Sequence, residues 1–473
     1  MSNDPAPRHI LIVGAGVFGL STALSLIHNP TYDGARITII DSSPTLPNPS
    51  GSSVDANRIV RADYANKQYA QLALQAQELW RDGRMESWGG EGRYHEPGFV
   101  LTAVADQDAY LAGALSNVRS LAQEDKRGRI DLGKIQELHG RDEIRKATGY
   151  EGVSGDHGYA NFNSGWANAE ACVAYALRRI RAEGGDRVDI RPNTRVQSLL
   201  VSAMECKGVT LLGGEQIQAD LTVLAAGAWT PTLIDLQGRC LATGQTMAFL
   251  DITQEEQAAM GSRPTIINQS SGMFIIPPRD KLLKVARHGY GYRNPVNIPK
   301  QTLRPGVVDG AATSGDVEVS VPDVGVPIPL EAEEALRGAL RELVPHMADR
   351  PFVRTRICWY CDTPTGDFLI TYHPAYKRLF LATGGSGHGF KFFPVIGDKI
   401  VAAMEGKVEP ELAEIWRWRS EEELKEVIRR QGEGEEFIAC ADGSRGGPKG
   451  MLLAEEMKRK RGLAEHKSGL AKL

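Results

Sequence analysis

HILIVGAGVFGLSTALSLIHN, residues 9–29, is the stretch of sequence that decides the fold. It places a short apolar run before a glycine-rich turn, and after the turn the apolar residues recur at helical spacing. A second apolar run, ARITIIDSS at residues 35–43, follows and contains Asp41. Strand, glycine turn, helix and second strand form a βαβ unit, which is typical of the start of a parallel sheet. The sequence therefore predicts an α/β fold.

The glycine turn at residues 14–19 fits the pattern G-x-G-x-x-G, with Gly14, Gly16 and Gly19 at its fixed positions. Such glycines permit a tight turn and close helix packing, and the helix N-terminus that follows can face a pyrophosphate. Asp41 can hold ribose hydroxyls and disfavours a 2′-phosphate. A purely structural turn is the alternative. Because the chain has no second fingerprint of this kind, we expect one dinucleotide and no separate nicotinamide site.

Two further strand–glycine junctions, DLTVLAAG (220–227) and LFLATGG (379–385), lie in the middle and towards the end of the chain. They predict a discontinuous, Rossmann-like nucleotide-binding domain, with an inserted α+β substrate domain that contains a mixed β-sheet. Helices are expected at about residues 66–84, 167–184 and 331–343. The predicted division assigns residues 1–62, 155–230 and 355–410 to the nucleotide-binding domain, 63–154 and 231–354 to the substrate domain, and 411–473 to a helical tail.

The bulk composition is that of an ordinary globular protein, with 473 residues, 42% hydrophobic and 24% charged. A formal net charge of -4 gives no reason to expect a nucleic-acid partner or an anionic membrane. No apolar run is long enough for a membrane span, and the N-terminus lacks a secretory pattern. The six cysteines are scattered, and the single C-x-x-C pair, Cys358 and Cys361, has no second pair to complete a zinc site. We therefore expect no metal.

The chain ends in Ala471-Lys472-Leu473, a conservative variant of the S-K-L address that the peroxisomal import receptor reads. A peroxisomal enzyme is the prediction. A chance match, and with it a cytoplasmic protein, is the alternative.

Three cationic residues invite a functional interpretation. Arg58 and Arg61 are spaced three apart in GSSVDANRIVRADY (51–64) and could both face one cavity if this segment is helical. Arginine suits bidentate carboxylate binding, but surface arginines are an equal alternative. Lys284 lies in an apolar strand-like context and is either an edge-strand charge, which the sequence favours, or a buried functional amine.

The loop SGHGFKF (386–392) contains His388 and Lys391. Its glycines would let the loop lie against a planar ligand, and a lysine there can serve an anionic substrate. An ordinary helix N-terminus, in which the glycines only cap and turn, is the alternative. Upstream, Cys358 and Tyr360 supply a thiol and an aromatic side chain.

Together these motifs resemble the sarcosine oxidase family of flavin-dependent amine oxidases, which includes monomeric sarcosine oxidase, pipecolate oxidase and the fungal fructosyl amino acid oxidases (amadoriases). The resemblance spans most of the chain and is carried by GAGVFG, GSSVDANRIVRADY, AAGAW, CWYCDTPTGDFLITYHP and GGSGHGFK. It implies FAD as the cofactor, oxygen as the acceptor and hydrogen peroxide as a product. It also implies an 8α-thioether between the flavin and Cys358 rather than Cys361.

The resemblance further implies roles for individual residues. Arg61 and Lys391 would hold the substrate carboxylate, and Lys284 would lie over the isoalloxazine and speed the reaction with oxygen. The pocket would be lined by His288, Tyr360 and His388. The implied cofactor-binding residues are Gly14, Gly16, Val17, Phe18, Gly19, Asp41, Ser42, Ser52, Arg58, Val196, Ala226, Gly227, Cys358, Gly387, Gly389, Phe390 and Lys391.

The predicted subgroup within this family depends on residues that differ from those of the amadoriases. The length, IWRWR (415–419) and the A-K-L ending are similar to theirs. However, Arg58 and Arg61 stand where amadoriases typically have lysine and serine, and His288 stands where they have an acidic residue. The prediction is a monomeric oxidase of secondary α-amino acids, N-methyl or cyclic. The alternatives are an amadoriase, a natural-product amine oxidase and, of another class, a non-catalytic dinucleotide-binding protein.

Overall fold

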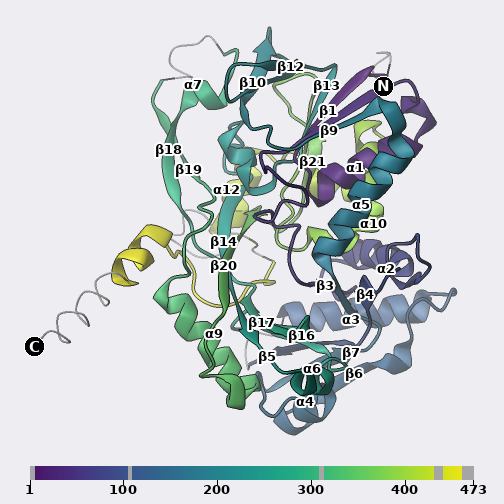
Figure 1. The fold of residues 1–473 in the computed structure, drawn as a ribbon, viewed down its shortest axis with the longest axis vertical. Helices are drawn as coiled ribbons and strands as arrows, with labels where there is room; N and C mark the ends of the chain where they lie inside the picture. Colours follow the sequence, from purple (N-terminus) through teal and green to yellow (C-terminus); the bar gives the residue numbers. More distant parts are fainter. Residues whose placement is uncertain (1–5, 105–108, 308–313, 431–439, 441, 461–473) are drawn as a thin grey trace, which may run out of the picture.

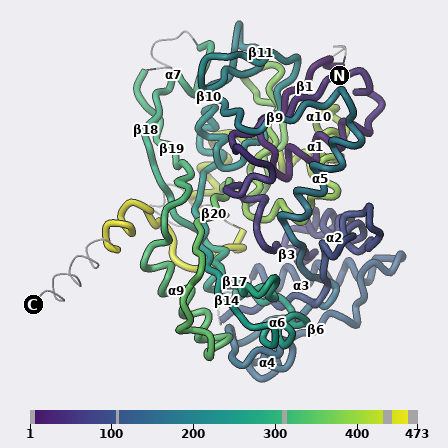
Figure 2. The backbone as a smooth tube through the Cα atoms, viewed as in Figure 1, coloured from purple at the N-terminus to yellow at the C-terminus, as the bar shows by residue number. Residues whose placement is uncertain are grey.

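The computed structural model describes residues 6–104, 109–307, 314–430, 440 and 442–460. Two β-sheets dominate these residues, one in the upper and one in the lower half of the view (Figure 1). The smooth trace of the chain shows the same arrangement, with residues 9–13 and 393–404 in the upper half (Figure 2). The Ala471-Lys472-Leu473 ending lies outside the described residues.

The upper sheet has six strands in the order β21-β22-β13-β1-β2-β9. All neighbours are parallel except β21, which is antiparallel to β22. Its central strands are almost continuous runs of isoleucine, leucine and valine because both faces are covered. The bounds are β1 (His9–Val13), β2 (Arg36–Ile40), β9 (Val188–Arg191), β13 (Leu221–Leu224), β21 (Leu369–Tyr372) and β22 (Leu379–Thr383).

Helices α1 (Val17–His28), α5 (Ala169–Gly184) and α10 (Phe393–Met404) lie together beside this sheet (Figure 1). Helices α1 and α10 touch so closely that a Cβ on Gly397 would lie 1.9 Å from the Ser21 carbonyl oxygen. A small antiparallel sheet also packs against the six-stranded sheet: Leu199 of the small sheet and Leu11 of β1 belong to the same buried cluster. Its strands are β10 (Val196–Ser202), β11 (Glu205–Leu211) and β12 (Gln216–Gln218).

The lower sheet has eight strands in the order β20-β14-β17-β16-β15-β5-β7-β6, and only β15 and β5 run parallel. Helix α9 (Leu330–Leu343) packs on it through Leu336 and Leu340, which share a buried cluster with Leu283 and Val285. The bounds are β5 (Phe99–Ala103), β6 (Ile135–His139), β7 (His157–Asn161), β14 (Leu241–Asp251), β15 (Thr265–Asn268), β16 (Met273–Arg279), β17 (Leu282–Arg287) and β20 (Arg354–Asp362).

The remaining elements connect or flank these two sheets. Strands β3 (Arg58–Val60), β8 (Gly165–Ala167) and β4 (Tyr94–His95) form a three-stranded sheet, and β18 (Pro295–Pro299) pairs with β19 (Asp316–Ser320). The other helices are α2 (Lys67–Arg81), α3 (Ala109–Glu124), α4 (Arg141–Thr148), α6 (Gln254–Met260), α7 (Lys300–Leu303), α11 (Pro410–Trp416) and α12 (Glu421–Arg429). Short 3₁₀ turns are η1 (Pro30–Tyr32), η2 (Leu132–Lys134), η3 (Gly185–Arg187), η4 (Gly227–Thr232), η5 (Pro345–Met347) and η6 (Gly389–Phe392).

The predicted architecture is confirmed: a doubly covered, mostly parallel sheet is combined with a mixed second sheet. The expected helices form α2, α5 and α9 with shifted ends. The exact division into domains stays a prediction. The chain leaves the eight-stranded sheet after Asp362 and enters the six-stranded sheet at Leu369.

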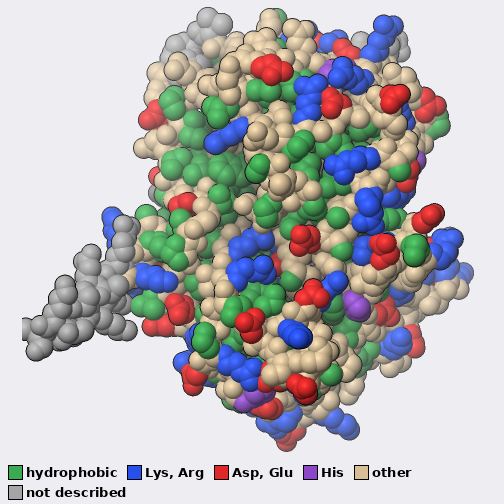
Figure 3. Space-filling view, in the orientation of Figure 1, with side chains coloured by type: hydrophobic (Ala, Val, Ile, Leu, Met, Phe, Trp, Pro, Cys, Tyr) green, Lys and Arg blue, Asp and Glu red, His purple; other side chains and the backbone are tan. Residues whose placement is uncertain are grey.

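No described helix is both long and apolar enough to cross a bilayer. Charged side chains of both signs are interspersed over the face shown in Figure 3, and apolar side chains gather in its upper half.

Candidate active site

The glycine turn between β1 and α1 is shaped by close backbone approach. Gly14 has φ +112, and a Cβ there would lie 2.4 Å from the Ala225 carbonyl oxygen, at the end of β13. A Cβ on Gly19 would lie 1.9 Å from the Gly14 carbonyl oxygen, so this glycine allows the helix to pack against the turn. Gly16 caps α1 without a side-chain hydrogen bond. The Val17 amide donates to Ser53 Oγ (3.0 Å), and the other amides of this helix N-terminus can face an anion such as a pyrophosphate.

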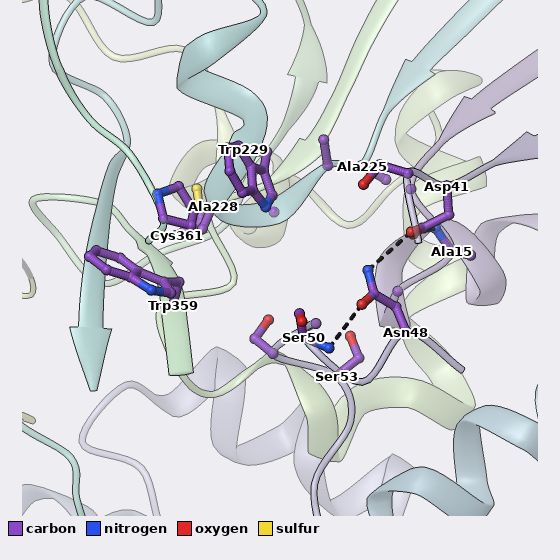
Figure 4. A pocket seen from close by; sticks show the side chains of 18 of the residues that line it. Ala15, Asp41, Asn48, Ser50, Ser53, Ala225, Ala228, Trp229, Trp359 and Cys361 are labelled. Atoms are coloured by element: carbon purple, nitrogen blue, oxygen red, sulfur yellow. Dashed lines mark hydrogen bonds between the residues drawn. The ribbon is translucent and has the colours of Figure 1, made fainter. Parts of the chain in front are cut away.

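Asp41 follows β2 and is held in place by three donors. Its carboxylate accepts hydrogen bonds from the Ala15 amide (3.0 Å), the Ser43 amide (2.9 Å) and Asn48 Nδ2 (3.0 Å). Figure 4 shows Asn48 linking Asp41 to Ser50, with Trp229, Trp359 and Cys361 across the cavity. The carboxylate therefore lies at the edge of the sheet where a ribose is expected.

A cavity of about 1000 Å³ opens at this edge. This location, at the carboxyl ends of parallel strands, is where doubly wound sheets bind their ligands. The volume lies at the upper end of the usual range for ligand sites, so a large ligand fits. The predicted residues that line it are Gly14, Gly16, Val17, Phe18, Asp41, Ser42, Ser52, Arg58, Val196, Ala226, Gly227, Tyr360, Gly387, Gly389 and Phe390.

Three predicted cofactor residues do not line this cavity: Gly19, Cys358 and Lys391. Gly19 lies behind the turn, where it packs against Gly14. The sequence analysis also missed lining residues, among them Asn48, Ser53, Trp229 and Trp359. The only sequence signal for Asn48 and Ser53 was a loop composition, which does not show which side chains turn inward.

Lys284 corrects one expectation. The sequence favoured an edge-strand charge, but β17 lies between β14 and β16, and the side chain of Lys284 is 1% exposed. Its Nζ donates to Asp55 Oδ2 (2.6 Å) and to the Asn57 carbonyl oxygen (3.0 Å). The lysine is buried because a carboxylate distant in sequence accompanies it into the interior.

The charges of this pair follow from their surroundings. Burial lowers the pKa of Lys284 to about 8, although the nearby Asp55 carboxylate opposes that shift. Burial acts to raise the pKa of Asp55, but Lys284 and Arg58 outweigh it and lower the value to about 2. Both groups are therefore ionised at neutral pH.

Arg58 lies on β3, so the helix that would have placed it on the same face as Arg61 does not form. Its Nη1 is 3.1 Å from Asp55 Oδ2, and its Nη2 donates to the Ser52 carbonyl oxygen (2.8 Å) and to Cys358 Sγ (3.3 Å). The surface alternative is also wrong, because the side chain of Arg58 is 11% exposed and Arg61 is 8% exposed.

Arg61 carries an unsatisfied donor. Its Nη2 donates to Tyr110 Oη (3.2 Å), and its guanidinium carbon lies 5.0 Å from the centre of the Tyr64 ring. Its buried Nη1 has no hydrogen-bond partner among the described residues. The nearby Asp63 carboxylate instead accepts from Asn161 (2.9 Å) and Ser164 (2.9 Å). A buried, unpaired guanidinium N–H calls for an anionic acceptor.

Lys391, His388 and Tyr64 form a chain with a defined proton order. His388 Nε2 lies 2.8 Å from the Gly366 carbonyl oxygen and must donate to it, so Nδ1 is an acceptor. Tyr64 Oη therefore donates to Nδ1 (3.0 Å) and accepts from Lys391 Nζ (2.7 Å). Burial, followed by the charge of Lys391, holds the pKa of His388 well below its usual value. Burial, with Arg61 and Arg445 nearby, also holds the pKa of Lys391 well below its usual value.

Cys358 and Cys361 face opposite sides of β20, because side chains alternate along a strand. Cys358 is fully buried beside Arg58, and its side chain shares a face of the strand with that of Tyr360. Cys361 lines the cavity, and its Sγ lies 3.3 Å from Thr383 Oγ1. Arg58, Arg61, Lys284 and Lys391, together with two residues that sequence reasoning did not single out, Asp55 and Arg445, are here called the charged region. Arg445 Nη1 lies 3.1 Å from Nδ1 of His288.

Similarity to known proteins assigns the chain to a family. A family model described as FAD dependent oxidoreductase matches residues 9–404. The chain belongs to this family. It is 34% identical to the amino acid oxidase imqH of Aspergillus flavus, over 88% of this chain and 98% of that protein. It is 30% identical to the L-saccharopine oxidase of Schizosaccharomyces pombe, over 89% and 95% of the two chains.

Solved structures agree with this assignment. The fructosamine oxidase of Aspergillus fumigatus (Amadoriase II) is similar at a TM-score of 0.74 and 28% identity, covering 94% of each chain. The predicted resemblance to the sarcosine oxidase and amadoriase group is thus confirmed, and with it a dependence on FAD. The residues at the cavity fit that cofactor: the glycine turn cannot accommodate a Cβ at Gly14, and the N-terminus of α1, where Gly16 provides no side-chain cap, lines the cavity.

Proposed function

We propose that this member of the FAD dependent oxidoreductase family is an oxidase of secondary α-amino acids, N-methyl or cyclic. The amine and its neighbouring C–H bond lose two electrons and two protons to form an imine, and O2 gains them to form hydrogen peroxide. The observation that carries this proposal is the buried, unpaired Nη1 of Arg61 beside Lys391.

Arg61 and Lys391 would bind the substrate carboxylate. Both cations lie over the Tyr64 ring, the Arg61 guanidinium carbon at 5.0 Å and Lys391 Nζ at 5.1 Å from its centre. Lys391 donates to a hydroxyl and a carbonyl, so neither of these hydrogen bonds pairs it with a carboxylate, and a bound carboxylate would favour its protonated form. A carboxylate at this position would satisfy the free guanidinium donor and would fix the orientation of the α-carbon.

The cavity-lining residues would hold FAD, which when bound accepts the electron pair of the substrate and passes it to oxygen. Asp41 would hold the ribose, and Arg58 would lie near the ring system. The Lys284 ammonium would supply the positive charge that stabilises reduced oxygen. His288, Tyr360 and His388 would shape the space around the substrate, and His388 would contribute no charge because it is neutral.

The second candidate is a fructosyl amino acid oxidase, which the similarity to Amadoriase II favours. A peroxide-coupled assay over sarcosine, N-methyl aromatic amino acids, pipecolate, saccharopine and fructosyl-valine separates the two. We expect turnover of one or more secondary amino acids without a sugar. Turnover of fructosyl-valine alone would overturn the proposed substrate class, and flavin reduction by none of these amines would favour a non-catalytic protein.

We also propose that the flavin is covalently attached through Cys358. Cys361 lines the cavity and Cys358 does not, so Cys361 is the alternative attachment site and its variant is the matched control. After acid precipitation, the flavin of the wild-type protein and of Cys361→Ser should remain with the pellet, whereas Cys358→Ser should release it. The reverse pattern would assign the tether to Cys361, and release from the wild type would refute a covalent bond.

Finally, we propose that the protein is a monomer that reaches the peroxisome through its Ala471-Lys472-Leu473 ending. Light scattering should give the chain mass of 51.5 kDa. A fluorescent N-terminal fusion should form puncta that overlap a peroxisomal marker. Removal of the last three residues should make the signal diffuse; a diffuse signal from the full chain would favour the cytoplasmic alternative.

A further inference from the structure

The chain returns to the charged region after the family match ends at residue 404. Residue 440 and residues 442–453, here called the C-terminal strap, run alongside loops of the eight-stranded sheet. The Cys440 amide donates to the Thr363 carbonyl oxygen (3.0 Å), and the Gly447 amide donates to the Ser270 carbonyl oxygen (3.0 Å). In Figure 1 this yellow segment passes across the middle of the molecule near β20. Backbone hydrogen bonds therefore hold the strap in place both before and after Arg445.

The side chain of Arg445 is fully buried and points into the charged region. Its Nη2 donates to Asp362 Oδ1 (2.8 Å) and to the Ser386 carbonyl oxygen (2.8 Å). Its guanidinium carbon lies 5.3 Å from the centre of the Tyr360 ring. Asp362 thus compensates the charge of Arg445 inside the protein, which a buried arginine requires.

The contact between Arg445 and His288 defines a proton position. Nη1 of Arg445 lies 3.1 Å from Nδ1 of His288. A guanidinium group has donors and no acceptor, so Nδ1 must be the acceptor. An imidazole that accepts at Nδ1 is neutral and carries its single proton on Nε2.

The other groups around His288 act in the same direction. Burial is the largest influence, and the cations of Arg445, Arg61 and Lys391 follow, with His388 making a smaller contribution. Together they hold the pKa of His288 well below its usual value. The centre of the Tyr360 ring is 6.0 Å from that of the His288 ring and adds no charge at neutral pH.

We propose that Arg445 is a positioning residue, supplied by the C-terminal strap, that holds His288 as the neutral Nε2–H tautomer. His288 then offers one hydrogen-bond donor and no charge. This matters because a further cation beside Arg61 and Lys391 would repel the amine end of a substrate whose carboxylate those residues bind. The consequence for catalysis rests on the proposed function, whereas the proton position of His288 does not.

The first test uses the wild-type holoenzyme without substrate. Nitrogen NMR of histidine-labelled protein reports which ring nitrogen carries the proton, and the His288→Gln spectrum assigns the His288 signals. We expect protonated Nε2, bare Nδ1 and no titration as the pH falls through 6.5, the ordinary value for histidine. A proton on Nδ1, or a midpoint near 6.5, would refute the proposal whatever the substrate is.

The second test compares Arg445→Met with Arg459→Met, a control at a side chain that is 71% exposed. Loss of the Arg445 charge should raise the titration midpoint of His288 by about one to three pH units. The acidic limb of kcat/KM should move to higher pH with it, and Arg445→Lys should restore part of the shift. Arg459→Met should change neither.

An Arg445→Met protein with wild-type flavin content and an unshifted His288 would overturn the role of Arg445. If this variant does not fold, the proposal is tested by Arg445→Lys and by the wild-type spectrum, because the proposal requires that His288 Nδ1 carries no proton in the wild-type protein. An unshifted pH limb together with a shifted His288 would instead count against the proposed place of His288 in catalysis, and so against the proposed function alone.

Discussion

The six-stranded sheet and the eight-stranded sheet contribute to the active site in different ways. At the end of the six-stranded sheet, the cavity is shaped by backbone, by glycines and by one anchored carboxylate, Asp41. Beside the eight-stranded sheet, long charged side chains from distant segments meet in the interior. Lys284 and Asp55 are 229 positions apart, and Arg445 and His288 are 157 positions apart. Shape dominates the first region and long-range electrostatics the second.

The largest effect is expected where backbone shape is broken. Gly14→Ala must accommodate a Cβ that lies 2.4 Å from the Ala225 carbonyl oxygen, at φ +112. Such strain costs about 1 to 3 kcal/mol before the overlap with the carbonyl oxygen is counted, so the protein should retain little or no FAD and the Tm should drop. Absorbance of bound flavin and thermal unfolding measure both. Gly34→Ala, at an exposed glycine with no atom within 4 Å of the added Cβ, is the control and should change neither.

Removal of the buried ammonium should come next. In Lys284→Met, Asp55 keeps Arg58 as a partner at 3.1 Å, but the positive charge offered to oxygen is lost. Removal of one such stabilising group costs about 10²- to 10³-fold, so reoxidation by oxygen should slow by that factor in stopped-flow measurements. Lys425→Met, at a side chain that is 71% exposed, is the control.

The same lysine predicts a pH dependence. The pKa of Lys284 is lowered to about 8, so the wild-type rate with oxygen should fall as the pH rises through 8, when the ammonium loses its proton. The rate of Lys284→Met should be low and flat across that range. A wild-type rate that is constant on both sides of pH 8 would rule out Lys284 as the charge that serves oxygen.

A smaller effect is expected at the carboxylate site. Arg61→Met removes a charged donor, which is worth about 1.5 to 3 kcal/mol, so KM should rise about 10- to 100-fold, with FAD content unchanged. Arg84→Met, at a side chain that is 86% exposed, should leave KM as it is. A KM close to wild type in Arg61→Met would place the substrate carboxylate elsewhere.

The smallest effect tests a side chain in the backbone-dominated region. Asn48→Ala removes the 3.0 Å hydrogen bond to Asp41, which keeps the amides of Ala15 and Ser43 as donors. One such bond contributes about 1 kcal/mol, so release of flavin should increase about fivefold in the Cys358→Ser background. A loss as large as that of Gly14→Ala would show that side chains, and not the backbone, dominate this end of the site.

The sequence predicted the region shaped by the backbone better than the region of buried charges. The glycine turn and Asp41 were predicted because a βαβ unit is a local pattern, whose spacing and apolar runs lie within about 30 residues. Lys284 was placed wrongly at a sheet edge because its strand order and its partner Asp55 are both non-local. A helix was the condition under which Arg58 and Arg61 were expected to face one cavity, but Arg58 lies on a strand, and burial is what makes both residues candidates for the site.

By itself, the sequence determined the parallel sheet and its dinucleotide-binding turn, since these depend on short-range spacing of glycines, apolar residues and one acidic residue, and its resemblance to known proteins implied the family and the cofactor. Only the tertiary structure decided which charges are buried, which of them are paired, and that the C-terminal strap brings Arg445 to His288. The physical reason is that burial and pairing depend on which segments meet in three dimensions, and the free energy of a charge depends on those neighbours rather than on its neighbours in the chain.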